Sequence, residues 1–193
     1  MNAIKHLITL TAVALLSACG GGSTDVTGTI TGLTASGLVL SNGTSTLGIN
    51  ANSTSFTFPT LADGTAYNVT VVTQPTGLNC TVTNGSGTAS ANASETSVAV
   101  ACSAVFSISG TVGVAGSGLV LNDGFEQIAV AAGAQTFAFP TQLKTGTAYA
   151  VTVTTQPSSP KQVCTVKGGG TNNDGTGTIA STAVTSVVVT CTP

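Results

Sequence analysis

Cysteines are the residues of this chain whose type and spacing could do chemistry. A cysteine can form a disulfide, bind a metal ion or act as a redox thiol. Four of the five cysteines fall into two widely spaced pairs, Cys80 with Cys102 and Cys164 with Cys191, and the only histidine of the 193 residues is His6. The wide spacing and the lack of a nearby histidine disfavour metal and redox roles. We therefore interpret the two pairs as structural disulfides.

The spacing of valines supports this pairing. In an antiparallel hairpin that places Cys80 opposite Cys102, Val82 lies opposite Val100 on the same face of the sheet. The second pair of cysteines has a valine pair at the same offset. Opposed strand residues have Cα atoms about 4.5–5.5 Å apart, which a disulfide can bridge. Each predicted bridge closes the last hairpin of its repeat and is worth about 3 kcal/mol of stability.

The first cysteine follows a targeting pattern. Lys5 precedes the apolar run Leu7–Leu16, and small residues then lead into Cys19, which is the order of a signal peptide. At about 1.5 Å per residue this run is too short to span a hydrocarbon core of about 30 Å. We expect residues 1–18 to be removed, and the glycine-rich residues 19–25 to form a flexible tether. An exported chain of this kind can keep disulfides.

Charge is sparse after the predicted signal peptide. This part of the chain has three lysines, six acidic residues and no arginine, histidine or tryptophan, so its net charge is −3. Three scattered lysines cannot neutralise a row of phosphates, which excludes nucleic-acid binding. The acidic residues closest in sequence, Asp123 and Glu126, bracket a predicted turn. We interpret Asp123 as a turn-forming residue rather than a catalytic carboxylate, and we predict no catalytic residues.

The sequence after the tether consists of two similar repeats. Thr27–Ile30 returns as Ser109–Val112, and Gly64–Val71 returns as Gly146–Val153. Gly-Leu-Val-Leu, Phe-x-Phe-Pro-Thr and Gln-Pro blocks are repeated in the same order. Within the blocks, apolar residues alternate with hydroxyl and amide residues, which is typical of half-buried strands. Insertions between matched blocks belong in loops, so the blocks themselves are the predicted strands.

Turn signals separate the predicted strands. An Asn-Gly pair at residues 42–43 and an Asp-Gly pair at 123–124 follow the Leu-Val-Leu blocks and indicate tight hairpins. We expect about seven strands in each repeat. The predicted fold is all-β, with two tandem seven-stranded antiparallel β-sandwiches of the Ig-like, Greek-key kind over residues 26–103 and 104–193. The short apolar connection, with Phe106 at the junction, predicts a stiff and elongated pair.

Two resemblances add to this interpretation. The segment at residues 16–19, Leu-Ser-Ala-Cys, resembles the lipobox of bacterial lipoproteins, which implies lipidation of Cys19. The repeated blocks resemble carboxypeptidase-regulatory or transthyretin-like domains and fibronectin type III domains. As a whole the pattern is most similar to the tandem Ig-like repeats of lipoproteins from Gram-negative bacteria. This resemblance implies that Tyr67 and Tyr149 are tyrosine-corner residues, with the ring in the core and the hydroxyl bonded to nearby backbone.

These features favour a non-catalytic, lipid-anchored envelope protein that acts as a structural spacer, an adhesin-like stalk or an interaction module. The alternative is a module that binds a peptide or a glycan through loops or sheet edges. The eight aromatic residues lie in apolar alternation or at the junction, so no exposed aromatic platform for a sugar is expected. An enzyme is disfavoured.

Partners and location follow from the same residues. The expected partners are the membrane, through the anchor, and an envelope or surface protein. No cofactor or metal is predicted, because the Asn-Asn-Asp-Gly loop at residues 172–175 offers calcium only one carboxylate. Gly20 and Gly21 follow Cys19 in place of the aspartate that resembles an inner-membrane retention signal. We therefore expect the lipid anchor in the outer membrane.

Overall fold

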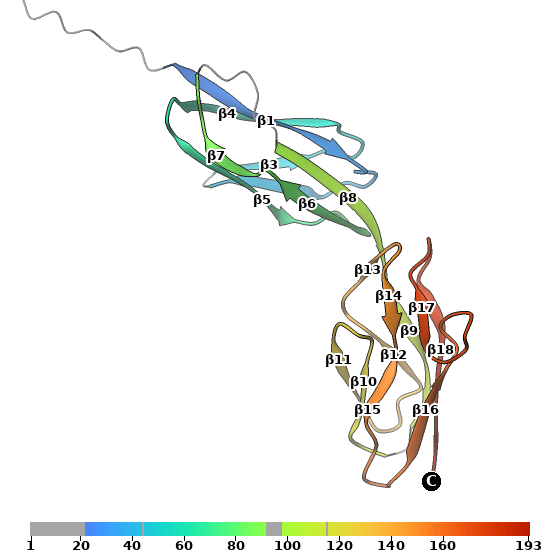
Figure 1. Ribbon diagram of the computed structural model, residues 1–193. Helices are drawn as coiled ribbons and strands as arrows, with labels where there is room; N and C mark the ends of the chain where they lie inside the picture. Colours follow the sequence, from blue (N-terminus) through green and yellow to red (C-terminus); the bar gives the residue numbers. More distant parts are fainter. Residues whose placement is uncertain (1–21, 44, 92–97, 115) are drawn as a thin grey trace, which may run out of the picture.

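The computed structural model describes residues 22–43, 45–91, 98–114 and 116–193. Within these residues all regular secondary structure is β-strand, apart from turns and bends, which confirms the all-β prediction. The strands form two bodies joined end to end, one from each repeat of the sequence (Figure 1). The predicted signal peptide and Cys19 lie outside the described residues.

Two sheets make up the first body. Its strands are β1 (Ser23–Thr31), β2 (Leu38–Asn42), β3 (Ser45–Ile49), β4 (Ser55–Ala62), β5 (Ala66–Thr73), β6 (Leu78–Thr83), β7 (Ser86–Thr88) and β8 (Val98–Phe106). One sheet has the order β4–β1–β8, with β6 on the other side of β8, and the second has the order β3–β2–β5–β7. Alternation in the sequence decides which face is buried: in β4, Phe56 and Phe58 are buried and Thr57 between them is exposed.

The second body is built from the matching blocks. Its strands are β9 (Ile108–Gly113), β10 (Leu119–Asn122), β11 (Gln127–Val130), β12 (Thr136–Ala138), β13 (Leu143–Lys144), β14 (Ala148–Ala150), β15 (Thr152–Thr155), β16 (Val163–Lys167), β17 (Thr176–Thr178) and β18 (Val184–Thr192). One sheet has the order β12–β9–β18–β16, and the others are β11–β10–β15 and the pair β14–β17. β14 and β15 together match β5 of the first body and are interrupted at Val151.

Two strand pairs are parallel, which corrects the prediction of antiparallel sandwiches. β1 runs parallel to β8, with Gly28 opposite Val98, and β9 runs parallel to β18, with Gly110 opposite Val187. Both glycines allow close approach: a Cβ at Gly28 would lie 2.6 Å from the carbonyl oxygen of Val98, and one at Gly110 would lie closer still to that of Val187. Alternation predicts which face of a strand is buried but not which strand lies beside it, so the sequence did not reveal this pairing.

Among the described residues the first body has eight strands and the second has ten, not the seven predicted for each, and some predicted boundaries shift as well. β7 and β17 are three-residue strands, Ser-Gly-Thr and Thr-Gly-Thr, and without apolar residues they give no alternation signal. β1 begins at Ser23, so the last three residues of the predicted tether at 19–25 already belong to the first sheet. β8 extends to Phe106, beyond the boundary predicted between residues 103 and 104.

Each body has its own hydrophobic core, drawn from its own strands. The repeated Phe-x-Phe block contributes the largest side chains: Phe56 packs edge to face against Phe58 with ring centroids 5.9 Å apart, and Phe137 packs against Phe139 in the same way at 5.9 Å. Burying a side chain of this size stabilises the fold by about 1.5–3 kcal/mol. The repeated block therefore contributes two phenylalanines to the hydrophobic core of each body.

Candidate functional site

Both predicted disulfides are present. Cys80 is bonded to Cys102 and Cys164 to Cys191, and in each pair the two Cα atoms are 3.9 Å apart. Each pair lies in register on an antiparallel hairpin, with a valine pair two residues along. The predicted pairing and register are confirmed. Cys19 lies outside the described residues, so its lipidation stays a prediction.

The repeated Gln-Pro block has a role that the sequence did not reveal. The N–H of Cys80 donates to Oε1 of Gln74 at 2.7 Å, and Nε2 of Gln74 donates to the carbonyl of Cys80 at 2.9 Å. Gln156 bonds to Cys164 in the same way, at 2.7 and 3.0 Å. Each glutamine thereby covers part of the outer edge of the strand that carries the first cysteine of a disulfide. An open strand edge is a template for another chain, so these side chains protect β6 and β16.

The short Cα separation within each disulfide follows from the strand register. The backbone N–H and C=O of Cys80 point toward Gln74, so Cys80 does not exchange these bonds with Cys102. Antiparallel residue pairs without mutual backbone hydrogen bonds are the more closely spaced ones. The disulfide therefore joins the closer type of strand pair.

The junction between the two bodies is a strand pairing. Beyond the disulfide, β8 continues, and Val105 lies opposite Lys144 while Phe106 lies opposite Leu143 of β13. The N–H of Val105 also donates to the carbonyl of Gly77 in the first body, at 3.0 Å. One strand therefore belongs to both bodies, and Figure 1 shows β8 running from the first into the second.

A cavity of about 480 Å³ lies at this junction. It is lined by residues 74–79 from the loop before β6 and the start of β6, by Val105 of β8, and by residues 140–142 from the segment before β13. We call it the junction cavity. None of these described lining residues carries a charge. A position between two packed units is one where ligand sites often form.

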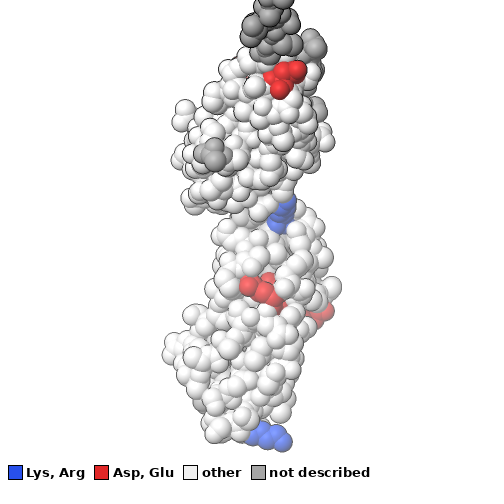
Figure 2. Space-filling model, turned by 90° about the vertical axis from the view of Figure 1, so that its left-hand side faces the viewer, with Lys and Arg blue, Asp and Glu red and all other residues white. Residues whose placement is uncertain are grey.

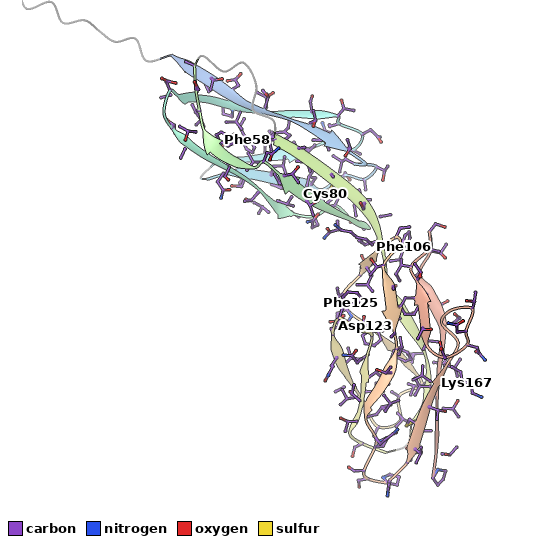
Figure 3. All side chains as sticks on the ribbon, viewed as in Figure 1. Phe58, Cys80, Phe106, Asp123, Phe125 and Lys167 are labelled. Atoms are coloured by element: carbon purple, nitrogen blue, oxygen red, sulfur yellow. A yellow bond between two sulfur atoms is a disulfide. The ribbon has the colours of Figure 1, made fainter. Side chains whose placement is uncertain are left out.

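An exposed aromatic ring lies on a loop that is hydrogen-bonded to the cavity lining through the next residue, Glu126. Phe125 is 57% exposed, and the matching residue of repeat 1 is Thr44. The fully buried Asp123 holds this loop, because its Oδ1 accepts the N–H groups of Phe125 at 2.9 Å and Glu126 at 2.8 Å. Oε1 of Glu126 in turn accepts the N–H of Thr141, a cavity residue, at 2.7 Å. Figure 3 shows Asp123 and Phe125 toward the end of the second body that joins the first.

These contacts settle two interpretations of the sequence. The hydrogen bonds of Asp123 confirm its turn-forming role, and within the described part of the chain its Oδ2 is buried without a hydrogen-bond partner. The expectation that every aromatic residue lies in apolar alternation or at the junction is wrong for Phe125. The Asp-Gly pair before it is the signal that places it on a loop, since the turn interrupts the alternation.

The two predicted tyrosine-corner residues lie opposite glycines of the short strands. Tyr67 pairs with Gly87, and Tyr149 pairs with Gly177. A Cβ at either glycine would lie 2.5 Å from the tyrosine hydroxyl oxygen, so each ring covers its glycine. Burial raises the pKa of the Tyr149 hydroxyl above its ordinary value. The hydroxyl-to-backbone bond of a tyrosine corner stays a prediction.

The loop considered for calcium is closed by its own hydrogen bonds. Oδ1 of Asn173 accepts the N–H of Gly168 at 2.9 Å, and Oδ1 of Asp174 accepts the hydroxyl of Thr176 at 2.5 Å and its N–H at 3.0 Å. The bond from the Thr176 hydroxyl is the main reason why the pKa of Asp174 lies below its ordinary value. Among the described residues, no three His, Cys, Asp or Glu side chains gather as metal ligands would.

A scan against protein-family models gives no match, and a search of curated proteins finds no relative. Within the described ranges there is no helix with the length and apolar character needed to cross a membrane. The two repeats can be compared with each other, and repeat 2 is longer by two residues between Gln156 and Cys164 and by five between Cys164 and Cys191.

Charge is sparse around these features, where Lys144 lies opposite Val105 and Glu126 is bonded to Thr141. Figure 2 shows charged side chains as isolated spots on the face that it presents. Contacts on such a surface depend on hydroxyl groups, amides and apolar side chains rather than on ion pairs. The lining of the junction cavity contains groups of all three kinds.

Proposed function

We propose that this chain is a non-catalytic, lipid-anchored envelope protein that acts as a stiff spacer and interaction module. The pairing of β8 with strands of both bodies carries the proposal. A spacer must keep its two ends at a fixed separation. A strand that is hydrogen-bonded on both sides of a junction restricts bending there more than a free linker does.

The finer description of the fold belongs to the same proposal. Each body is an Ig-like, Greek-key β-sandwich, and the two correspond to domains at residues 26–103 and 104–193. Separate cores and one disulfide in each repeat support this division. The carboxylates Asp123 and Glu126 bond to backbone N–H groups of loops, which supports a structural role for them.

The anchor and its location come from the sequence. Residues 1–18 are a lipoprotein signal peptide, Cys19 carries the lipid, and the protein resides in the outer membrane. The first described strand begins only four residues after Cys19, so the folded part would start close to the membrane surface. In a Cys19→Ser variant, we expect unprocessed precursor or loss from the membrane fraction. Unchanged fractionation would contradict the anchor.

Small-angle scattering of the full chain tests the spacer. We expect one elongated shape with a narrow distribution of maximum dimension. An eight-residue Gly-Ser insertion between Phe106 and Ser107 should broaden this distribution, and the same insertion in the loop at residues 168–175 serves as the control. Equal breadth in the wild type and the junction variant would refute a stiff junction.

A second candidate function is ligand binding through loops. Two observations favour it, namely the exposed ring of Phe125 and a junction cavity with an uncharged lining. The two functions are compatible, because a spacer can carry a binding site at its junction.

A further inference from the structure

We propose that the junction cavity, together with the ring of Phe125, is a binding site for a neutral saccharide. The proposal goes beyond the spacer function and does not depend on the lipid anchor. It rests on the chemistry of the cavity lining, on the covered edge of β6 and on the fixed position of Phe125.

The cavity lining matches an uncharged ligand with many hydroxyl groups. Its volume of about 480 Å³ lies within the range of about 300–1,000 Å³ that is usual for small-molecule sites. Among the described lining residues are the side-chain amides of Asn79 and Gln142 and the hydroxyl of Thr141. Amides and hydroxyls both donate and accept hydrogen bonds, as sugar hydroxyls do. The lining residues themselves carry no charge, and the charged residues that contact them, Lys144 opposite Val105 and Glu126 bonded to Thr141, have opposite signs.

Apolar surface completes the lining. The apolar lining residues include Pro75 from the first body, Pro140 from the second, and Val105 of the shared strand β8. Proline presents a rigid apolar face that has little conformational entropy to lose. The C–H faces of a sugar ring can pack on such surfaces while its hydroxyls bond to the amides.

The covered edge of β6 argues against an extended peptide at the same place. A peptide usually binds a sheet by pairing its backbone with an open strand edge. Beside the cavity, the N–H and C=O of Cys80 are already bonded to the side chain of Gln74. At Cys80 the edge of β6 therefore has no free backbone group to offer a peptide strand.

Phe125 supplies an aromatic platform on a rigid loop. Its backbone N–H is bonded to the buried Asp123, and the neighbouring Glu126 is bonded to Thr141 of the cavity. The ring is 57% exposed. Holding an aromatic ring in advance lowers the ordering cost of binding. Repeat 1 has Thr44 at the matching position, so the platform belongs to the second body alone.

The experiment is a binding screen of the full chain. The probes are an array of neutral hexose and N-acetylhexosamine oligosaccharides, a matched set of sialylated and sulfated oligosaccharides, and a set of uncharged peptides. Calorimetry with the best neutral oligosaccharide then compares wild type with Phe125→Thr and Gln142→Ala. Val163→Thr is the matched control. Val163 is 52% exposed on β16, an edge strand of the second body, and it does not line the junction cavity.

We expect binding of neutral oligosaccharides and an affinity loss of about tenfold for each of the two site variants, since an aromatic contact or a buried hydrogen bond is worth about 1 kcal/mol or more. The Val163 variant should bind like the wild type. A preference for charged oligosaccharides or peptides, no binding of neutral oligosaccharides at millimolar concentration, or equal affinity of the Phe125 variant and the wild type would overturn the proposal. Thermal unfolding of each variant separates lost binding from lost folding.

Discussion

Gln74 and Cys80 are joined by two hydrogen bonds, so that a side-chain amide stands where the backbone of a neighbouring strand would stand. The donor and acceptor of the amide match the C=O and N–H of the strand residue. Gln156 and Cys164 repeat the relationship in the second body. The glutamine of the Gln-Pro block therefore caps the edge of the strand that carries the first cysteine of each disulfide.

Replacing this glutamine should destabilise the first body. Gln74→Ala removes both bonds, and we expect a loss of about 1–3 kcal/mol in the free energy of unfolding by chemical denaturation. Gln74→Glu keeps the acceptor but loses the donor to the Cys80 carbonyl, so it should also destabilise. The exposed Gln127 provides the control, and its replacement by alanine should change stability by less than about 0.5 kcal/mol. Equal stability of the Gln74 and Gln127 variants would contradict the cap.

Removing one disulfide should weaken mainly the repeat that contains it. For the double variant Cys164→Ala and Cys191→Ala, we expect a loss of about 3 kcal/mol, because the closed loop limits the unfolded chain. Non-reducing peptide mapping and urea unfolding with and without reductant measure the pairing and its effect. If the two bodies are separate domains, the unfolding of the first should be unchanged. A shift of both transitions by the same amount would show that they unfold together.

Asp123 offers a test of buried charge. Asp123→Asn keeps the acceptor that holds Phe125 and Glu126 and introduces an uncharged amide of nearly the same shape. Asparagine occurs naturally at the matching position of repeat 1, Asn42. We expect stability to be retained or increased, since an unpaired buried carboxylate oxygen is costly. Asp123→Ala, which removes the acceptor, should cost about 1–3 kcal/mol. Denaturation curves compare the two, and equal losses would refute the turn-holding role.

The ring-covered glycines predict a sharp positional effect. In Gly177→Ala, the new methyl group would lie 2.5 Å from the hydroxyl oxygen of Tyr149, so the ring must move, at a cost of about 1–3 kcal/mol. Gly113→Ala is the matched strand variant, because no heavy atom lies within 4 Å of its added Cβ. We expect Gly113→Ala to be neutral or slightly stabilising. Thermal unfolding of both variants decides the point, and similar melting temperatures would contradict the contact.

Tyr149 predicts how stability changes at alkaline pH. Burial raises the pKa of its hydroxyl in the folded chain above the ordinary value, so folding favours the protonated form. The stability from this group is complete below about pH 10 and is lost as the pH rises through the raised pKa. Tyr149→Phe cannot ionise there. The stability difference between wild type and this variant should therefore shift against the wild type above about pH 10, and a constant difference would refute the prediction.

Alternation in the sequence predicted most of the strands, and the two disulfides followed from the index relation between the cysteines. The paired valines made that relation reliable, because Val82 and Val100 need the same register as Cys80 and Cys102. The junction was predicted as an apolar contact. The pairing of β8 with β13 was not predicted, because a strand of two residues is too short to show an alternation of apolar and polar residues.

The features missed by the sequence depend on neighbours distant along the chain. The parallel pairing of β1 with β8 joins strands about seventy residues apart, and no local pattern encodes it. The edge caps, the exposed ring of Phe125 and the orphaned oxygen of Asp123 likewise require knowledge of what lies beside each group. Repetition of Gln-Pro was the visible signal for the caps, because a block that recurs in both repeats has a structural task in both.

The parallel arrangement of the first and last strand in each body has a mechanical consequence. Because β1 and β8 run in the same direction, a pull on the start of one and the end of the other slides the two strands along their length. The hydrogen bonds between them are then strained together and not broken one after another. β9 and β18 face the same kind of load in the second body, and β8 passes the tension directly across the junction. Tension applied to the two ends of the chain would therefore load both parallel pairs in shear.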